Sequence, residues 1–353
     1  MYKADITIIG AGIVGLAIAA EIAGKDRSVF ILEKNETFGG ETSSRNSQVI
    51  HAGIYYPEGS LKAKTCVEGN RILYELCHKQ GIQHERKEKL IVSTDISEVK
   101  QLDELRIRGE KNGVEGLRIL SKDEIRQIEP NVRAMAALLS PSTGIIDVHT
   151  LMGYFLQKAR SDGAQIAYKT KVVEIEKKQI DYKVFVEGPG ESFSFMSKIV
   201  INCAGLYSEE IARLAGIETT AAGYQLHYCK GEYFKVGKSK SHLTQRLVYP
   251  VPNPEGAGLG IHVTPRLDGT MLLGPNTRYV DKIDYSVDER QKESFCDSVK
   301  KFLPAIGCED LEPEMAGIRP SLQGPRDNFR DFIIRDEGDK GLPGFIDLIG
   351  IES

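Results

Sequence analysis

Three glycines near the start of the chain have a spacing that lets the backbone approach a pyrophosphate. The pattern G-x-G-x-x-G is formed by Gly10-Ala11-Gly12-Ile13-Val14-Gly15. Its first glycine permits a tight turn, its second a close approach to phosphate, and its third the packing of a helix on a strand. The N-terminus of that helix also favours negative charge. The motif therefore predicts a dinucleotide site; a purely structural glycine turn is the alternative.

The segments around this motif predict the elements that would hold it. Residues 5–9 alternate and are rich in β-branched side chains, residues 16–23 have helical composition, and residues 28–33 again have the composition of a strand. This is a βαβ unit, the opening of a doubly wound sheet. Glu33 ends the second strand, where its carboxylate can accept ribose hydroxyl groups and would repel the 2′-phosphate of NADP.

A polar loop follows, and it helps to decide which dinucleotide is bound. In an NAD dehydrogenase the strands and helices would usually continue to alternate. Residues 38–57 are instead rich in glycine, serine and asparagine and are predicted to be mostly loop. The loop concentrates hydroxyl groups with Arg45 and His51. Such a loop can hydrogen-bond a second phosphate and then run beside a ring system.

Residues 43–56, Ser-Ser-Arg-Asn-Ser-Gln-Val-Ile-His-Ala-Gly-Ile-Tyr-Tyr, resemble the flavin-contacting stretch of a known superfamily. It is the FAD-dependent D-amino-acid oxidase and glycerol-3-phosphate dehydrogenase superfamily, and the segment looks like its L-2-hydroxyglutarate dehydrogenase/oxidase branch. Similar motifs lie along the whole chain: Lys230-Gly-Glu-Tyr-Phe234, Tyr249-Pro-Val-Pro252, Leu259-Gly-Ile-His-Val-Thr264, Leu273-Gly-Pro-Asn276, Gly317-Ile-Arg-Pro320 and Leu348-Ile-Gly-Ile-Glu-Ser353. The resemblance implies FAD as the cofactor and an α/β fold, a Rossmann-like FAD-binding domain with an inserted mixed β-sheet substrate domain.

The resemblance also assigns FAD contacts to matching positions. The ADP half would be held by the glycine motif, Glu33 and Lys34, and the pyrophosphate and flavin by Thr42, Ser43, Asn46, Ser47 and Gln48. Val173 would contact the adenine side through its backbone, with an ordinary core position as the equal alternative. At Ala204 and Gly205 the backbone would approach the cofactor closely a second time. Gly350 and Ile351 would direct backbone N–H groups towards the N1/O2 edge of the flavin.

Oxidation of a 2-hydroxy acid needs a carboxylate anchor, a base for the hydroxyl proton, and a substrate C–H over flavin N5 for hydride transfer. Arg319 is the predicted anchor, because a guanidinium can grip a carboxylate with two hydrogen bonds; a structural pair with an internal acid is the alternative. His51 and His262 are the candidate bases, with His51 slightly favoured. A second contact for a dicarboxylate would come from Lys230, Tyr249 or Tyr55.

The implied function is oxidation of L-2-hydroxyglutarate, or a similar short 2-hydroxy acid, to the 2-oxo acid, with electrons passed to a quinone or to oxygen. One alternative keeps the fold but oxidises an amine, as glycine and sarcosine oxidases do. The other is a non-catalytic FAD-binding or tRNA-modifying protein, for which a basic surface or a cysteine at the flavin would be expected.

Composition narrows the class of protein further. The chain has 353 residues, 41% hydrophobic and 27% charged, which favours a globular protein of two domains. The 46 basic and 50 acidic residues give a net charge of -4, which disfavours nucleic-acid binding. Six scattered cysteines are predicted to be reduced, with no metal site and a cytoplasmic location. The longest apolar stretch, residues 6–20, is too short to span a bilayer, and peripheral contact with the inner face of the cytoplasmic membrane stays open.

The chain is expected to build two domains from interleaved pieces. Residues 1–85, 145–215 and 317–353 are assigned to the FAD-binding domain, and residues 86–144 and 216–316 to the substrate or cap domain. Helices are predicted near residues 60–80, 97–112, 150–161 and 288–302. The resemblance also implies a further turn and a final helix beyond Ser353, with its N-terminus towards the flavin.

Overall fold

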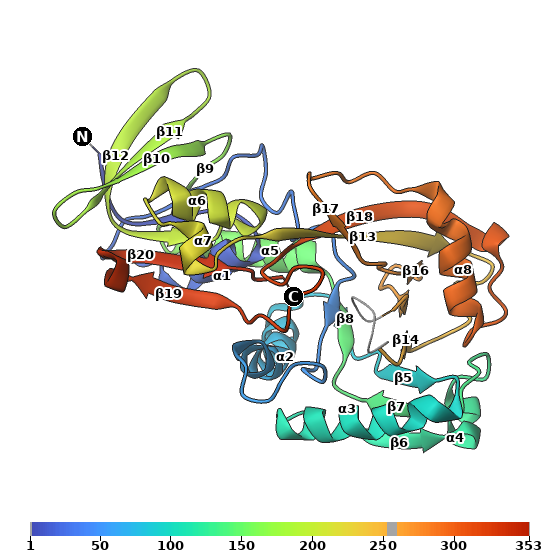
Figure 1. Cartoon of the computed structure of the whole chain (residues 1–353). Helices are drawn as coiled ribbons and strands as arrows, with labels where there is room; N and C mark the ends of the chain where they lie inside the picture. The colour runs from blue at the N-terminus through green and yellow to red at the C-terminus, as the bar shows by residue number, and fades with distance from the viewer. Residues whose placement is uncertain (1, 253–259, 353) are drawn as a thin grey trace.

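The structure, a computed structural model, describes residues 2–252 and 260–352. Leu259 and Ser353, which belong to the quoted motifs, lie outside the described residues. The described strands form sheets of eight, nine and three strands. Figure 1 shows the two large sheets side by side, each with its own helices, and the small sheet between them.

The eight-stranded sheet contains the glycine motif. It has the order β10-β11-β12-β1-β2-β9, and β20 pairs with β12 and β19. Its strands are β1 (Lys3–Ile9), β2 (Val29–Leu32), β9 (Gln165–Ala167), β10 (Lys171–Lys177), β11 (Tyr182–Glu187), β12 (Ser192–Asn202), β19 (Ile333–Glu337) and β20 (Leu342–Ile349). β1 runs parallel to both β2 and β12, and β20 runs parallel to β12. The predicted βαβ opening of a doubly wound sheet is therefore confirmed.

Helices cover both faces of this sheet. Their bounds are α1 (Ile13–Ile22), α5 (Val148–Ser161), α6 (Ser208–Leu214) and α7 (Thr219–Ala222). One apolar cluster joins Leu16 of α1 and Met152 of α5 to Ile8 of the sheet. A second cluster joins Ile211 of α6 to the other side of the sheet. The two clusters fix the strands whose ends carry the glycine motif.

The nine-stranded sheet has the order β17-β13-β16-β15-β14-β5-β7-β6, with β18 paired to β13. Its strands are β5 (Lys89–Ser93), β6 (Arg118–Ser121), β7 (Ala136–Ser140), β13 (His227–Val236), β14 (Leu247–Pro250), β15 (Val263–Pro265), β16 (Met271–Leu273), β17 (Arg278–Val280) and β18 (Leu311–Ser321). The helices of this part are α3 (Val99–Lys111), α4 (Lys122–Ile128) and α8 (Lys292–Lys300). β18 runs unbroken across residue 317, where a domain boundary was placed, and the division into domains stays a prediction.

Two connections link the large sheets. β13 and β18 form a long antiparallel ladder, from His227 opposite Ser321 to Val236 opposite Leu311. Figure 1 shows this ladder running from the nine-stranded sheet towards the eight-stranded one. The small sheet, β3 (Val49–Ile50), β8 (Gly144–Ile146) and β4 (His84–Glu85), lies between them beside α2 (Leu61–Gln80).

Local chemistry explains where the helices begin. α5 starts two residues before the predicted residue 150, because the Asp147 carboxylate accepts a hydrogen bond from the Thr150 N–H and caps the helix. α2 matches the predicted helix, with Ser60 as its cap. The helix predicted at 288–302 is shorter, since Asp288 instead caps a separate 3-10 turn. Residues 38–57 are mostly loop as predicted, apart from the two residues of β3.

One cysteine prediction was wrong. Cys296 in α8 and Cys308 form a disulfide, with their Cα atoms 5.3 Å apart. The chain turns back after α8 and brings together two residues separated by 12 positions, which the spacing alone did not indicate. The other four cysteines are free thiols: Cys66, Cys77, Cys203 and Cys229.

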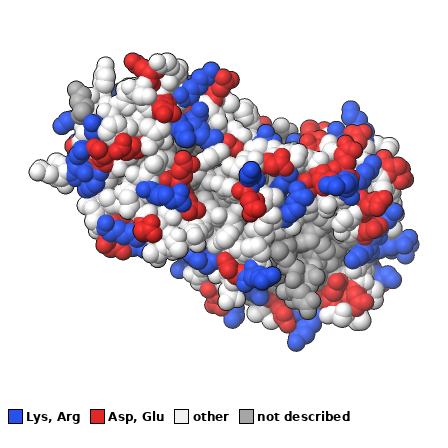
Figure 2. All heavy atoms as spheres, turned by 45° about the horizontal axis from the view of Figure 1, so that its top comes forward, with Lys and Arg blue, Asp and Glu red and all other residues white. Residues whose placement is uncertain are grey.

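Charge and hydropathy add two findings. Basic and acidic side chains are interspersed on the face seen in Figure 2, and neither sign forms a continuous patch there. Within residues 2–252 and 260–352, no helix is both long and apolar enough to cross a membrane. In the same residues no group of three or more His, Cys, Asp or Glu side chains could hold a metal ion.

Candidate active site

The glycine motif forms a tight turn between β1 and α1. Gly10 has φ +106°, and a Cβ added to it would lie 2.5 Å from the carbonyl oxygen of Cys203. A Cβ on Gly15 would overlap the carbonyl oxygen of Gly10, so the helix can approach the turn only without a side chain there. A Cβ on Gly12 would meet the Ser43 hydroxyl at 3.0 Å. The motif thus has the close backbone packing that a dinucleotide site requires.

Glu33 fastens this turn at the end of β2. Its side chain is buried, with Oε2 accepting from the Ala11 N–H and Oε1 accepting from the Asn35 N–H, both at 2.9 Å. Each carboxylate oxygen keeps a lone pair with which it could accept a ribose hydroxyl. Lys34, the next residue, pairs with Glu41 at 2.8 Å, and its ammonium lies 4.3 Å from the centre of the Tyr207 ring.

The loop after β2 connects the glycine turn to β18. Ser43 Oγ accepts from the N–H of Ile13, the first residue of α1, at 2.9 Å. Thr42 Oγ1 donates to the carbonyl oxygen of Ile318 at 2.8 Å, which ties the loop to the strand that carries Arg319. Asn46 folds the loop by donating to the carbonyl oxygen of Ser43 and accepting from the N–H of Gln48, both at 2.9 Å. The hydroxyl-rich loop therefore lies between the glycine turn and the second sheet.

The remaining predicted FAD contacts lie at strand ends or irregularities of the first sheet. Val173 is the extra residue of a β-bulge, because the register of β10 on β11 shifts between Val172 and Glu174. A bulged residue has backbone groups that the ladder does not pair, which agrees with a backbone contact. The turn residues after β12 and β20, including Gly205 with φ +55° and Gly350 with φ +73°, lie at the carboxyl ends of parallel strands. Their contacts with FAD stay predictions.

Four predicted catalytic or substrate residues lie in one cluster. The His262 and Tyr249 rings stack with their centres 3.5 Å apart. Lys89, on β5, lies between two tyrosines, with its ammonium 4.7 Å from the centre of the Tyr55 ring and 4.8 Å from that of Tyr249. His51 is near enough for the charge of Lys89 to lower its pKa. His51, Tyr55 and Tyr249 are thus neighbours of a lysine that the sequence analysis did not select, and His262 joins the cluster through Tyr249.

Burial changes the titration of this cluster. Burial, reinforced by the Lys89 charge, lowers the pKa of His51 to about 3. Burial also lowers the pKa of Lys89 to about 7. The imidazole of His51 is therefore neutral at pH 7, the form that a general base requires.

Arg319 lies on β18 opposite Cys229 of β13, with Nη2 3.1 Å from the cysteine sulfur. Within the described residues its guanidinium forms no ion pair with a carboxylate. The charge of Glu352 is near enough to raise the pKa of Arg319, but that carboxylate pairs with Lys62 at 2.7 Å, so the alternative of a structural Arg–acid pair stays open. Tyr233, also on β13, lies nearby: burial raises its pKa to about 12, and the Arg319 charge opposes the rise. A substrate carboxylate would supply the anion that Arg319 lacks.

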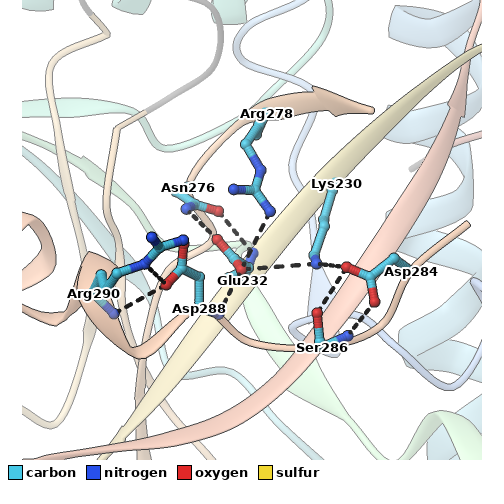
Figure 3. A network of polar contacts seen from close by, with 8 residues as sticks. All are labelled: Lys230, Glu232, Asn276, Arg278, Asp284, Ser286, Asp288 and Arg290. Carbon is cyan, nitrogen blue, oxygen red and sulfur yellow. Dashed lines mark hydrogen bonds and ion pairs between the residues drawn. The ribbon is translucent and has the colours of Figure 1, made fainter. Parts of the chain in front are cut away.

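Lys230 has a different environment from the one predicted. It is fully buried, and its ammonium lies 2.7 Å from Asp284 Oδ2 and 3.8 Å from Glu232 Oε1. Figure 3 shows it inside a polar network that ties residues 276–290 to β13. Side chains alternate along a strand, so Lys230 faces away from its neighbour Cys229, which contacts Arg319. The predicted substrate contact of Lys230 therefore finds no support in these contacts.

Two site residues were missed by sequence reasoning. Tyr233 belongs to the same motif as Lys230, three residues further along β13. Side chains alternate along a strand, so the tyrosine points to the opposite face from the lysine, which is the face of Arg319. Lys89 had a weaker signal: it begins the apolar run Lys-Leu-Ile-Val of β5. A lysine at a strand end is usually exposed, and only the neighbouring loop and β14 show that this one is buried.

Comparisons with known proteins agree with this geometry. A sequence profile described as FAD dependent oxidoreductase, DAO, matches residues 5–352. The mitochondrial L-2-hydroxyglutarate dehydrogenase of Arabidopsis thaliana is 38% identical over 389 residues, covering 99% of this chain and 80% of that protein. The L-2-hydroxyglutarate dehydrogenase of Indibacter alkaliphilus is 36% identical over 274 residues, covering 77% of this chain and 67% of that protein.

Solved structures share the fold. Dithionite-reduced L-alpha-glycerophosphate oxidase from Mycoplasma pneumoniae, with FAD bound, has a TM-score of 0.87 at 27% identity and covers 100% of this chain and 91% of its own. Glycine oxidase from Geobacillus kaustophilus has a TM-score of 0.79 at 21% identity, and the match covers 100% of this chain and 90% of that one. At this identity the likeness concerns the fold alone. The predicted fold class, a Rossmann-like FAD-binding fold with an inserted mixed sheet, is confirmed.

The first prediction tests the glycine turn. Gly10→Ala should lower the free energy of unfolding by about 1–3 kcal/mol, because the backbone is left-handed there and the added methyl group overlaps a carbonyl oxygen. It should also reduce the FAD-to-protein absorbance ratio. The control is Gly69→Ala, in α2 with open space around it, which should keep FAD and gain about 0.5–1 kcal/mol in denaturant unfolding. Equal FAD content in the two variants would contradict this role of Gly10.

Proposed function

This chain belongs to the DAO family of FAD dependent oxidoreductases, and from that premise we propose that it oxidises L-2-hydroxyglutarate, or a similar short 2-hydroxy acid, to the 2-oxo acid. The observation that carries the proposal is the Arg319 guanidinium, which lies near Tyr233 and the loop of residues 42–48 and forms no ion pair with a carboxylate among the described residues. The relatives' printed activity supports L-2-hydroxyglutarate as the specific substrate.

The residues around the glycine turn fit FAD, the cofactor of the family. At Gly10 and Gly15 the backbone packs too closely for a Cβ, and at Gly12 a Cβ would lie 3.0 Å from the Ser43 hydroxyl. This is the tight turn on which a pyrophosphate would be bound. Glu33 would hold the ribose, and the hydroxyls and amides of residues 42–48 would line the pyrophosphate and the ring system. When bound, FAD supplies a hydride acceptor.

The chain's own residues would perform the remaining chemistry. Arg319 would bind the C1 carboxylate with two hydrogen bonds and so orient the C2 hydroxyl and the C2–H bond. His51, neutral because burial lowers its pKa to about 3, would take the hydroxyl proton as the hydride leaves C2. His262, stacked on Tyr249, is the second candidate for this base. The products are the 2-oxo acid, a protonated histidine and the reduced cofactor.

The electron acceptor and the location are also proposals. We retain a quinone or oxygen as the acceptor and the cytoplasm as the location, with the inner face of the cytoplasmic membrane as the docking place if the acceptor is a quinone. Two of the curated relatives differ on location in their printed names, one being called mitochondrial and the other not. Anaerobic reoxidation of the reduced flavin by a soluble quinone, compared with reoxidation in air, would separate the two acceptors.

An anaerobic titration tests the substrate. L-2-hydroxyglutarate should bleach the flavin absorbance, whereas its D-isomer, lactate, glycerol 3-phosphate, glycine and sarcosine should bleach it far more slowly. Bleaching by glycine or sarcosine alone would favour an amine oxidase on the same fold. Bleaching by none of them would favour a non-catalytic FAD-binding protein.

A second prediction concerns the anchor. Arg319→Ala should weaken the apparent affinity for L-2-hydroxyglutarate in flavin reduction by about 10- to 100-fold, since a hydrogen bond to a charged group contributes about 1.5–3 kcal/mol. Arg319→Lys should recover part of this affinity, because it restores the charge but not the fork of donors. Arg290→Ala is the control, as its side chain is 88% exposed. An unchanged affinity in Arg319→Ala would remove it as the anchor.

The third prediction separates the two histidines by pH. His51→Ala should slow the limiting rate of flavin reduction by about 100-fold or more, as the loss of a general base does. In the unsubstituted enzyme this rate should stay level from pH 8 to about pH 5, because a lowered pKa keeps His51 unprotonated. Exposed His78→Asn serves as the control. A rate that falls below pH 6.5, or one that survives in His51→Ala, would instead point to His262 or solvent.

A further inference from the structure

Lys89 is a buried cation without a counter-ion among the described residues. Only 1% of its surface is exposed, and it begins β5 inside the nine-stranded sheet. Its ammonium faces the rings of Tyr55 and Tyr249 at 4.7 and 4.8 Å, contacts that attract a cation but do not neutralise it. The other lysine considered for the site, Lys230, is paired with Asp284 at 2.7 Å.

The groups that face Lys89 are neutral around pH 7. His51 follows β3, and its lowered pKa keeps its imidazole uncharged. Cys66 comes from α2, and burial raises the pKa of its thiol to about 11. Burial also raises the pKa values of Tyr55, from the loop, and of Tyr249, from β14. In the part of the chain that the structure describes, none of these neighbours therefore brings a negative charge to Lys89.

An unpaired buried charge is unfavourable, and the usual remedies are an ion partner or loss of the charge. Burial lowers the pKa of Lys89 to about 7, so the ammonium is only partly retained at neutral pH. The hydroxyl of Tyr55 is also buried and has no hydrogen-bond partner in the described part of the chain. The ammonium lies 4.7 Å from the centre of the ring that carries this hydroxyl, so a cation and a phenol donor, two groups that bind a carboxylate, are close together.

Lys89 belongs to the same site as Arg319. One row of paired residues crosses four adjacent strands: Val248 of β14, Val263 of β15, Leu273 of β16 and Phe234 of β13. Side chains alternate along a strand, so the next row, with Tyr249, His262 and Tyr233, lies on the other face of the sheet. Arg319 joins this face through Cys229 of β13, and Lys89 joins it through Tyr249, on which His262 stacks. The guanidinium and the ammonium therefore belong to one face of the sheet, with aromatic side chains between them.

We propose that Lys89, with the Tyr55 hydroxyl, binds the distal carboxylate of a short dicarboxylate while Arg319 binds the carboxylate beside the reacting carbon. This assignment rests on the proposed function and names what would select a dicarboxylate over a monocarboxylate. Two cations at opposite ends of one site match the two charges of the substrate, and the aromatic walls between them match its methylene groups. Lys89 is a specificity-determining residue, and no proton transfer is required of it.

The test uses two ligands that cannot be oxidised. Glutarate carries two carboxylates, and glutaramate replaces one of them with an amide of the same shape. Binding to the FAD-loaded protein is measured by calorimetry and by the change in flavin absorbance. The unsubstituted protein should bind glutarate about 10- to 100-fold more tightly than glutaramate, the range expected for a hydrogen bond to a charged group. In Lys89→Met this preference should disappear, while the affinity for glutaramate, held by Arg319, should stay within a few fold.

Lys89→Arg should keep the preference, because it keeps the charge. Lys100→Met is the control, since that lysine is 87% exposed on α3. Lys89→Met is expected to fold with an unchanged or higher melting temperature, as it removes an unpaired buried charge. With L-2-hydroxyglutarate, it should raise the apparent dissociation constant in flavin reduction far more than it changes the limiting rate.

The unsubstituted protein provides a second test that needs no variant. The preference for glutarate should fall as the pH rises above neutral, since the ammonium form is present below the pKa of Lys89 and is lost above it. A preference that is absent in the unsubstituted protein, or that persists unchanged in Lys89→Met, would overturn the assignment. Glutarate binding that depends on Lys89, without bleaching by L-2-hydroxyglutarate, would instead refute the proposed oxidation and leave the dicarboxylate site standing.

Discussion

The constraint on which this site depends is the positive charge of two side chains, Arg319 and Lys89, that form no ion pair with a carboxylate among the described residues. Arg319 contacts a cysteine sulfur, and Lys89 contacts two aromatic rings, where most buried cations of a protein meet a carboxylate. Both charges reduce the stability of the folded chain on their own, and both become favourable when an anion binds. The charges of the site are therefore complementary to those of an anionic ligand and are not balanced by the protein's own carboxylates among the described residues.

The rest of the fold keeps these two cations in place. Arg319 is held by the β13–β18 ladder, and Lys89 by pairing of β5 with β14, where it lies opposite Leu247. The loop of residues 42–56 passes from the glycine turn to both of them, through the Thr42 hydrogen bond to Ile318 and the packing of Tyr55 on Lys89. Rigid strands and one fastened loop thus bring a nucleotide turn and an anion site together.

Local patterns predicted the parts of the structure that local chemistry determines. The glycine turn, Glu33 at the end of β2 and the long polar loop each follow from residue type and spacing, and the family resemblance indicated the inserted sheet. The predictions that failed concern contacts between distant segments. Lys230 forms an ion pair with Asp284, and the turn after α8 brings Cys296 to Cys308. The loop and β14 bury Lys89. No periodicity within one segment records any of these contacts.

The charge of Lys89 also acts on the histidine proposed as the base. It adds to burial, the larger cause, in lowering the pKa of His51, which keeps the imidazole neutral. A carboxylate bound at Lys89 would offset that charge, while burial would still hold the pKa of His51 below its usual range. The imidazole would therefore stay unprotonated with the substrate in place, ready to accept the hydroxyl proton. The lysine would accordingly favour the dicarboxylate through affinity far more than through rate.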